Sequence, residues 1–75
     1  MKIRFYGKLR DITGAAQIEK DFAGDCATLL QWIICEYPPL KKQVFALAVN
    51  DRIAKHSEKI GKDDTVALVP PYSGG

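Results

Sequence analysis

The sequence lacks any long hydrophobic segment. Its longest apolar run is the six residues from Val44 to Val49, whereas a transmembrane helix needs about 20 such residues. The first residues, Met-Lys-Ile-Arg, also lack the apolar stretch of a secretory signal peptide. We therefore expect a cytoplasmic protein that makes no contact with a membrane.

Cysteine and histidine are scarce, with two cysteines and one histidine in the chain. Cys26 and Cys35 lie in one predicted helix, at a spacing that separates their Cα atoms by about 13.5 Å and points them to opposite sides. A disulfide needs Cα atoms within about 7 Å of each other. Two thiols and the distant His56 are also a poor set of zinc ligands. We expect no internal disulfide, no metal site and a surface position for His56.

Positive charge is neither abundant nor concentrated. Eleven basic residues against nine acidic ones give a net charge of +2, and the basic residues are spread from Lys2 to Lys62. Nucleic-acid binding requires a concentrated basic face, so we expect no nucleic-acid partner. The sequence also lacks the G-x-x-x-x-G-K-[ST] loop that holds nucleotide phosphates. We therefore expect no directly bound cofactor, and any ATP that is used would be bound by a partner.

The chain of 75 residues, 47% hydrophobic and 27% charged, has the composition of one ordinary globular domain. A domain of this size buries only about 60% of the surface that its unfolded chain exposes. Little core is left in which to enclose an active site. The size therefore favours a protein that is recognised by others and is not catalytic alone.

Hydrophobic periodicity predicts the element order β, short helix, β, long helix, β, β, β. Strands are expected at residues 2–6, 17–22, 44–50, 53–55 and 65–69, and helices at 8–13 and 26–37. The long helix carries the clearest signals, because Asp25 is a good N-cap, an apolar stripe follows it, and Pro38-Pro39 ends it. Gly14 is available as a left-handed cap for the short helix.

This order predicts an α+β fold of the ubiquitin-like β-grasp type. One long helix would cover one face of a mixed sheet of about five strands, with the short helix beside it. The long helix would connect the N-terminal hairpin to the later strands, so that the last strand lies parallel to the first. We expect the folded domain to span residues 1–69 and an extended tail to span residues 70–75.

The composition of the tail predicts a stiff, extended spacer that ends in two residues without side chains. Its residues are Pro70, Pro71, Tyr72, Ser73, Gly74 and Gly75. The two prolines cannot donate ladder hydrogen bonds, so the chain leaves the sheet in an extended form. The two glycines lack side chains and fit a narrow channel. We expect Gly75 to present a free carboxylate, which is a poor electrophile until an ATP-binding partner converts it to an acyl-adenylate.

The segment from Asp63 to Gly75 closely resembles the C-terminus of the small, MoaD-type subunit of molybdopterin synthase, in the MoaD/ThiS sulfur-carrier family. That family ends in an acidic turn, an apolar strand, Pro-Pro, two variable residues and Gly-Gly. The resemblance continues at residues 5–14 and at Leu47–Asn50, and it spans essentially the whole chain. The Pro-Pro-x-x-Gly-Gly ending is its specific part.

The resemblance implies a sulfur carrier for molybdenum cofactor biosynthesis. A partner related to ubiquitin-activating enzymes would adenylate Gly75 with ATP, and a sulfur donor would convert the adenylate to a thiocarboxylate. The tail would enter a large, MoaE-type subunit and donate its sulfur to cyclic pyranopterin monophosphate, with Gly74 giving the tail its reach. Two carriers on a dimer of large subunits would form a heterotetrameric synthase.

A docking surface for partners is expected beside the root of the tail. If Val66 and Leu68 face the long helix, then Ala67 and Val69 face outward, as does Tyr6 on the neighbouring strand. We hypothesise that these three outward residues form an exposed apolar patch that binds partners together with the tail residues Pro70 to Ser73. Scattered surface hydrophobics are common, so chance exposure is the alternative explanation.

Three other functions are compatible with the sequence. The chain could carry sulfur for thiamine or another product, although Pro-Pro before the tail is typical of the molybdopterin branch. It could be a ubiquitin-like modifier whose Gly75 is joined to target lysines. It could also be a plain interaction module, for which the two terminal glycines would be dispensable.

Overall fold

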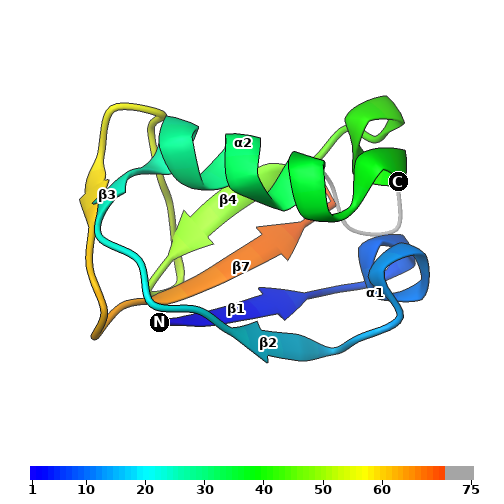
Figure 1. The fold of residues 1–75 in the computed structure, drawn as a ribbon, viewed down its shortest axis with the longest axis horizontal. Helices are drawn as coiled ribbons and strands as arrows, with labels where there is room; N and C mark the ends of the chain where they lie inside the picture. Colours follow the sequence, from blue (N-terminus) through cyan, green and yellow to red (C-terminus); the bar gives the residue numbers. More distant parts are fainter. Residues whose placement is uncertain (71–75) are drawn as a thin grey trace.

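The computed structural model describes residues 1–70; residues 71–75 lie outside the described part. Ten elements follow one another along the chain: β1 (Lys2–Phe5), α1 (Lys8–Thr13), β2 (Gln17–Glu19), β3 (Gly24–Asp25), α2 (Cys26–Glu36), η1 (Pro38–Lys42), β4 (Ala46–Val49), β5 (Arg52–Ile53), β6 (Lys59–Ile60) and β7 (Thr65–Val69). Their arrangement is the ubiquitin-like β-grasp fold that the periodicity predicts (Figure 1).

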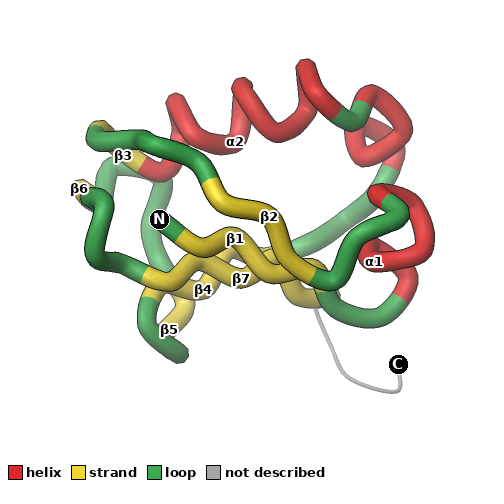
Figure 2. The backbone as a smooth tube through the Cα atoms, turned by 60° about the horizontal axis from the view of Figure 1, so that its bottom comes forward, coloured by secondary structure: helices red, strands yellow, loops and turns green. Residues whose placement is uncertain are grey.

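The main sheet has five strands in the order β2-β1-β7-β4-β5. Strand β7 is its middle strand, and it runs parallel to β1 with Phe5 opposite Leu68. All other pairs are antiparallel. The predicted parallel pairing of the first and last strands is therefore confirmed. Figure 2 shows α2 crossing above this sheet, with β3 and β6 at one end of the molecule.

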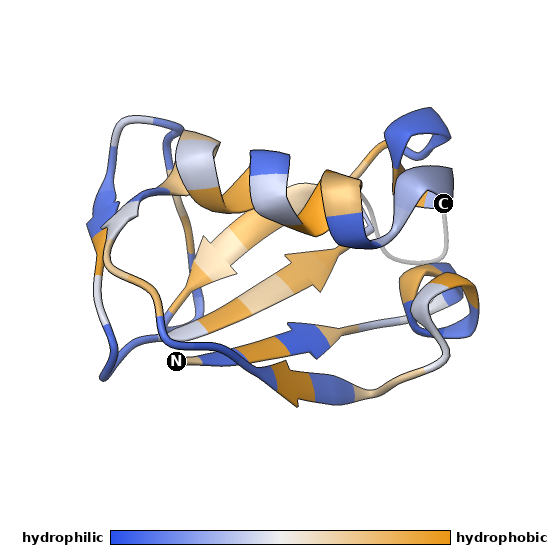
Figure 3. Ribbon diagram, in the orientation of Figure 1, coloured by the Kyte–Doolittle hydropathy of each residue, from blue (hydrophilic) through white to orange (hydrophobic). Residues whose placement is uncertain are grey.

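The core lies between α2 and the sheet face turned toward it. Leu29 and Ile33 of α2 are fully buried, as are Ile3, Val66 and Leu68 of the central strands. Each such side chain stabilises the fold by about 1.5–3 kcal/mol relative to an exposed one. Figure 3 shows the apolar colouring concentrated on the sheet-facing side of α2 and along β4 and β7. No buried polar side chain is present among the described residues.

Both predicted helices form where expected, and their caps explain why. The Asp25 carboxylate accepts a hydrogen bond from the Thr28 N–H at 2.9 Å, which starts α2 at Cys26. Gly14 adopts φ 75°, the left-handed conformation that closes α1. No helix among residues 1–70 is long and apolar enough to cross a membrane.

Several strands are shorter than the sequence predicts. Strand β2 ends at Glu19, because its ladder covers only Lys2 to Arg4 of β1. Beyond it, Lys20 leaves the strand and places its ammonium 4.2 Å from the centre of the Trp32 ring. Strand β4 begins at Ala46, with Val44 75% exposed before it. The return strand is Arg52–Ile53 rather than residues 53–55, since only these two residues pair with β4.

Two features of the fold are absent from the prediction. The segment after α2 does not simply stop at the proline pair but continues as η1, whose first turn accommodates proline and whose Leu40 is fully buried. Strands β3 and β6 form a second, two-stranded sheet. Strands of two residues have no alternation that a sequence pattern could reveal.

Two turns are joined by one carboxylate beside the start of β7. Asp64 accepts hydrogen bonds from the Gly61 N–H at 2.8 Å and from the Asn50 amide at 2.9 Å. The Asn50 oxygen in turn accepts from the Thr65 N–H at 3.0 Å. The Gly61 N–H first, and the Asn50 amide second, lower the pKa of Asp64 below its ordinary value of 3.8.

These bonds predict a loss of stability in acid. Because folding lowers the pKa of Asp64, its contribution is fully present above about pH 4 and is lost as the pH falls through the folded-state value. We expect the Asp64→Asn variant to show a smaller fall in melting temperature than the wild type between about pH 5 and pH 2. Asp63→Asn, which removes a neighbouring exposed carboxylate, is the control. Identical pH profiles for Asp64→Asn and the wild type would contradict this assignment.

Candidate functional site

The root of the tail lies at the end of the middle strand of the sheet. Strand β7 is paired with β1 on one side and β4 on the other, up to Leu68 and Val69 respectively. The Tyr6 N–H donates to the Leu68 carbonyl at 3.2 Å, and Pro70 follows without an N–H of its own. The sheet therefore fixes where the tail begins. The predicted tail residues Pro71, Tyr72, Ser73, Gly74 and Gly75 lie outside the described residues.

A glycine stands beside this root. Gly7 links β1 to α1 with φ 57° and ψ −133°, a backbone conformation that side chains strongly disfavour. A Cβ atom added there would lie 3.4 Å from Cγ of Pro70, an ordinary van der Waals contact. Backbone strain, rather than lack of space, is thus the reason for glycine at this position.

We expect Gly7→Ala to destabilise the fold by about 1–3 kcal/mol through this strain. Gly14→Ala is the matched comparison, because Gly14 also has a positive φ of 75° but has no atom within 4 Å of an added Cβ. The backbone of Gly14 lies in the more accessible left-handed helical region, so the loss of folding stability in Gly14→Ala should be smaller, roughly 1 kcal/mol. Chemical denaturation of both variants measures the difference. An equal loss would show that the Gly7 backbone carries no special strain.

The outward-facing residues of β7 lie as the alternation predicts. Val66 and Leu68 are fully buried beneath α2, whereas Ala67 and Val69 are partly exposed on the opposite face. Tyr6 is 44% exposed. Tyr6, Ala67 and Val69 line one pocket of about 360 Å³. The predicted patch is therefore a real surface feature, while its role in binding stays a prediction.

This surface extends further across the sheet than the sequence suggests. We call it the apolar pocket, and its lining residues are Tyr6, Ala48, Asp51, Ile53, Ala67 and Val69. Strand pairing places Ala67 opposite Ala48, and Ala48 opposite Ile53, which is 64% exposed. Two small alanines between larger neighbours leave a depression in the sheet surface. Ile53 could have been found only from the register of β5 on β4.

The reactive side chains elsewhere in the described part do not assemble into a catalytic group. Cys26 is fully buried, and burial raises the pKa of its thiol, so it is protonated at neutral pH. Cys35 and His56 are both exposed. Among residues 1–70, no three side chains of His, Cys, Asp or Glu lie close enough together to hold a metal ion. The distinctive surface of the described part is thus the apolar pocket at the root of the tail.

Comparisons with known proteins identify a matching family and similar folds. The sequence model of the ThiS family matches residues 3–75. A solved structure from Pyrococcus furiosus, provisionally described as subunit 1 of molybdopterin converting factor, is similar with a TM-score of 0.83 and 22% identity over 95% of each chain. The small archaeal modifier protein SAMP1 from Haloferax volcanii has a TM-score of 0.80 and 21% identity over 100% of this chain and 98% of that one.

A third similar structure comes from a complex. It is the complex of subunits 1 and 2 of the molybdopterin-converting factor from Helicobacter pylori, in which the matching chain is 28% identical with a TM-score of 0.64. The match covers 99% of this chain and 96% of that one. These likenesses show that the fold is shared along essentially the full length of each chain.

Proposed function

Because this chain belongs to the ThiS family, a family of sulfur carriers and ubiquitin-like modifiers, we propose that it carries sulfur for molybdopterin biosynthesis. The observation that carries the proposal is the family match through residue 75, which takes in the Pro-Pro-x-x-Gly-Gly segment. In this function the carboxylate of Gly75 is the site of sulfur loading, and Gly74 lets it reach the substrate.

Loading the carrier with sulfur needs two partners. An adenylating enzyme of the ubiquitin-activating type binds ATP, and the Gly75 carboxylate displaces pyrophosphate to form an acyl-adenylate. A sulfur donor then displaces AMP and leaves a thiocarboxylate. This sulfur is transferred to cyclic pyranopterin monophosphate, and water restores the carboxylate. Support comes from the described residues, which form an exposed apolar pocket of about 360 Å³ beside the root of the tail.

The receiving partner in this proposal is the large subunit of molybdopterin synthase, with two carriers bound to a dimer of large subunits. The Helicobacter pylori complex joins subunits 1 and 2 of a molybdopterin-converting factor, and its matching chain is 28% identical to this one. The apolar pocket, with Tyr6, Ala67 and Val69 next to Pro70, is the surface that would bind the large subunit. Pro71, Tyr72 and Ser73 would then contact the large subunit where the tail enters it.

A second candidate function is protein modification. Similarity to SAMP1 from Haloferax volcanii favours it at the level of the fold. In that case the Gly75 carboxylate would form isopeptide bonds with lysines of other proteins. Sulfur carriage for thiamine or another product uses the same thiocarboxylate but a different acceptor.

Intact-mass spectrometry of the protein isolated from its host tests whether it carries sulfur, and sulfur transfer to cyclic pyranopterin monophosphate by a reconstituted synthase tests the acceptor. We expect a species ending at Gly75 that is heavier than the carboxylate form by the difference between a sulfur atom and an oxygen atom. Lysine-linked conjugates without this species would favour the modifier. If neither the thiocarboxylate nor lysine-linked conjugates are found, the result would favour a plain interaction module.

A further inference from the structure

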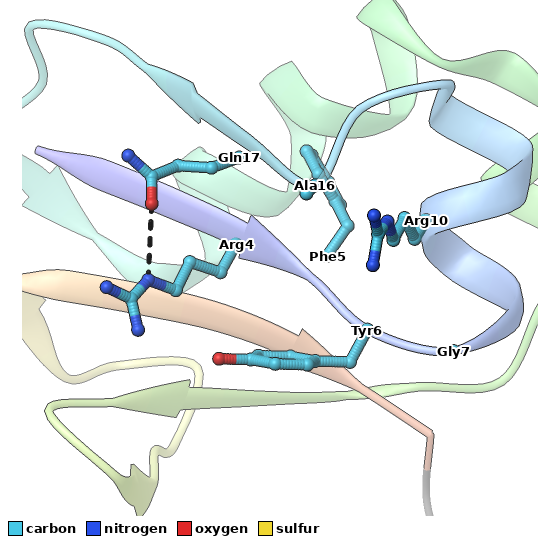
Figure 4. A pocket seen from close by; sticks show the side chains of 7 residues that line it. All are labelled: Arg4, Phe5, Tyr6, Gly7, Arg10, Ala16 and Gln17. Atoms are coloured by element: carbon cyan, nitrogen blue, oxygen red, sulfur yellow. Dashed lines mark hydrogen bonds between the residues drawn. The ribbon is translucent and has the colours of Figure 1, made fainter.

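A second pocket lies on the other side of Tyr6. It has a volume of about 250 Å³ between the end of β1, helix α1 and the segment before β2 (Figure 4). We call it the arginine pocket, and its lining residues are Arg4, Phe5, Tyr6, Gly7, Arg10, Ala16 and Gln17. It shares Tyr6 with the apolar pocket, so one side chain separates the two.

Among the residues that the structure describes, two arginines and no acidic residue line the arginine pocket, which is therefore positively charged. Figure 4 shows the guanidinium groups of Arg4 and Arg10 on opposite sides of the pocket. The Nε of Arg4 donates to the Gln17 side-chain oxygen at 3.3 Å, a bond that does not use the two terminal nitrogens of the guanidinium group. Within residues 1–70, the ion pair present joins Arg52 to Glu58 and involves neither of these arginines.

We infer that the arginine pocket receives an acidic segment of the same partner protein that covers the apolar pocket. This inference rests on the proposed function, because it assumes that a large subunit docks at the root of the tail. Arginine is always charged and presents a planar fork of donors suited to carboxylates. A partner that covers the apolar pocket also covers Tyr6, and therefore reaches the rim of the arginine pocket.

A protein carboxylate fits this pocket better than a small metabolite. Pockets for small ligands commonly have volumes of roughly 300–1,000 Å³, whereas the arginine pocket has a volume of about 250 Å³ and is lined by two arginine side chains. A charged site at the margin of an apolar contact is the usual anatomy of a protein interface, in which the charges select the partner and orient it. Here the two arginines would set the direction in which the tail enters the partner.

The test compares three forms of the full-length carrier for binding to the large synthase subunit of the same organism by isothermal titration calorimetry. The first is the wild type, and the second is the Arg4→Gln/Arg10→Gln double variant. The third, Lys55→Gln/Lys62→Gln, removes the same charge from exposed loops that flank β6, at the end of the molecule opposite the root of the tail (Figure 1). Thermal melts check that each form is folded; within residues 1–70, the Arg4 side chain makes one hydrogen bond, which is exposed.

We expect the arginine double variant to bind roughly tenfold or more weakly than the wild type, and the lysine control to bind within about twofold of it. The difference in affinity between the wild type and the arginine double variant should become smaller when ionic strength rises from about 0.05 to 1 M, because salt screens charge pairs at an interface rim. Equal weakening in both variants would overturn the inference in favour of a general charge effect, and unchanged binding of the arginine variant would overturn it outright. Failure of the wild type to bind the large subunit would instead overturn the proposed function on which the inference rests.

Discussion

Removal of Gly75 is expected to reduce dithiolene formation by at least about a hundredfold in a reaction reconstituted with a large synthase subunit. The shortened chain still ends in a glycine carboxylate, so its terminal chemistry is retained. Its reach, however, is shorter by about 3.5 Å, the span of one extended residue. Misplacing a reacting atom by only 1 Å can cost about a hundredfold in rate. Product formation from thiocarboxylated wild-type and shortened chains measures the effect.

The control for this deletion keeps the whole tail and changes a side chain elsewhere. Lys62→Gln changes one exposed turn residue and leaves the tail intact, so we expect nearly wild-type product formation. The shortened chain should also bind the large subunit, because the apolar pocket lies on the sheet and not in the tail. Wild-type product formation by the shortened chain would contradict the role assigned to Gly75.

The second large effect is expected from Val69→Asp, which should weaken binding to the large subunit by about a hundredfold or more. Val69 lines the apolar pocket and precedes Pro70 at the root of the tail. A carboxylate buried there by a partner would lose its hydration without gaining a matched donor, at a cost of several kcal/mol. The few interface residues that carry most of the binding energy each change it by about 2 kcal/mol or more when altered. Calorimetric titration measures the change.

The isolated domain should tolerate this substitution, because Val69 is only partly buried on the face away from α2. Gln31→Asp is the matched control, since it adds the same charge at an exposed position of α2. We expect that variant to bind like the wild type. Unchanged affinity of Val69→Asp would eliminate the apolar pocket as the docking surface, and unfolding of the isolated domain would assign Val69 a structural role.

The fold could be predicted where the sequence carries a long or chemically distinct pattern. The apolar stripe of α2, its Asp25 cap and the alternation in β7 each identify an element by local physics. The parallel pairing of β1 and β7 followed from the helix that connects the two halves. Strands β3 and β6 were not predicted. Each has only two residues, and their pairing joins segments that are far apart in the sequence. The resemblance of the tail to the MoaD/ThiS carriers is confirmed at the level of the family.

The alternation within single strands predicted part of the candidate site, but not how the site extends across neighbouring strands. Alternation alone placed Tyr6, Ala67 and Val69 on the outward face, and the structure groups them in one pocket. Ile53 joins them through the register of two neighbouring strands, which no periodicity encodes. Arg4 and Arg10 are brought together by the turn at Gly7 between β1 and α1, so their shared pocket becomes visible only in three dimensions.

The position of β7 has a mechanical consequence. Its C-terminal end carries the tail, and both of its long edges are hydrogen-bonded, to β1 on one side and β4 on the other. A pull on Val69 along the strand axis therefore loads the bonds of both ladders in shear, many at once, instead of opening them one after another. A partner that pulls on the tail therefore applies its force to the middle strand of the sheet, which is hydrogen-bonded along both edges.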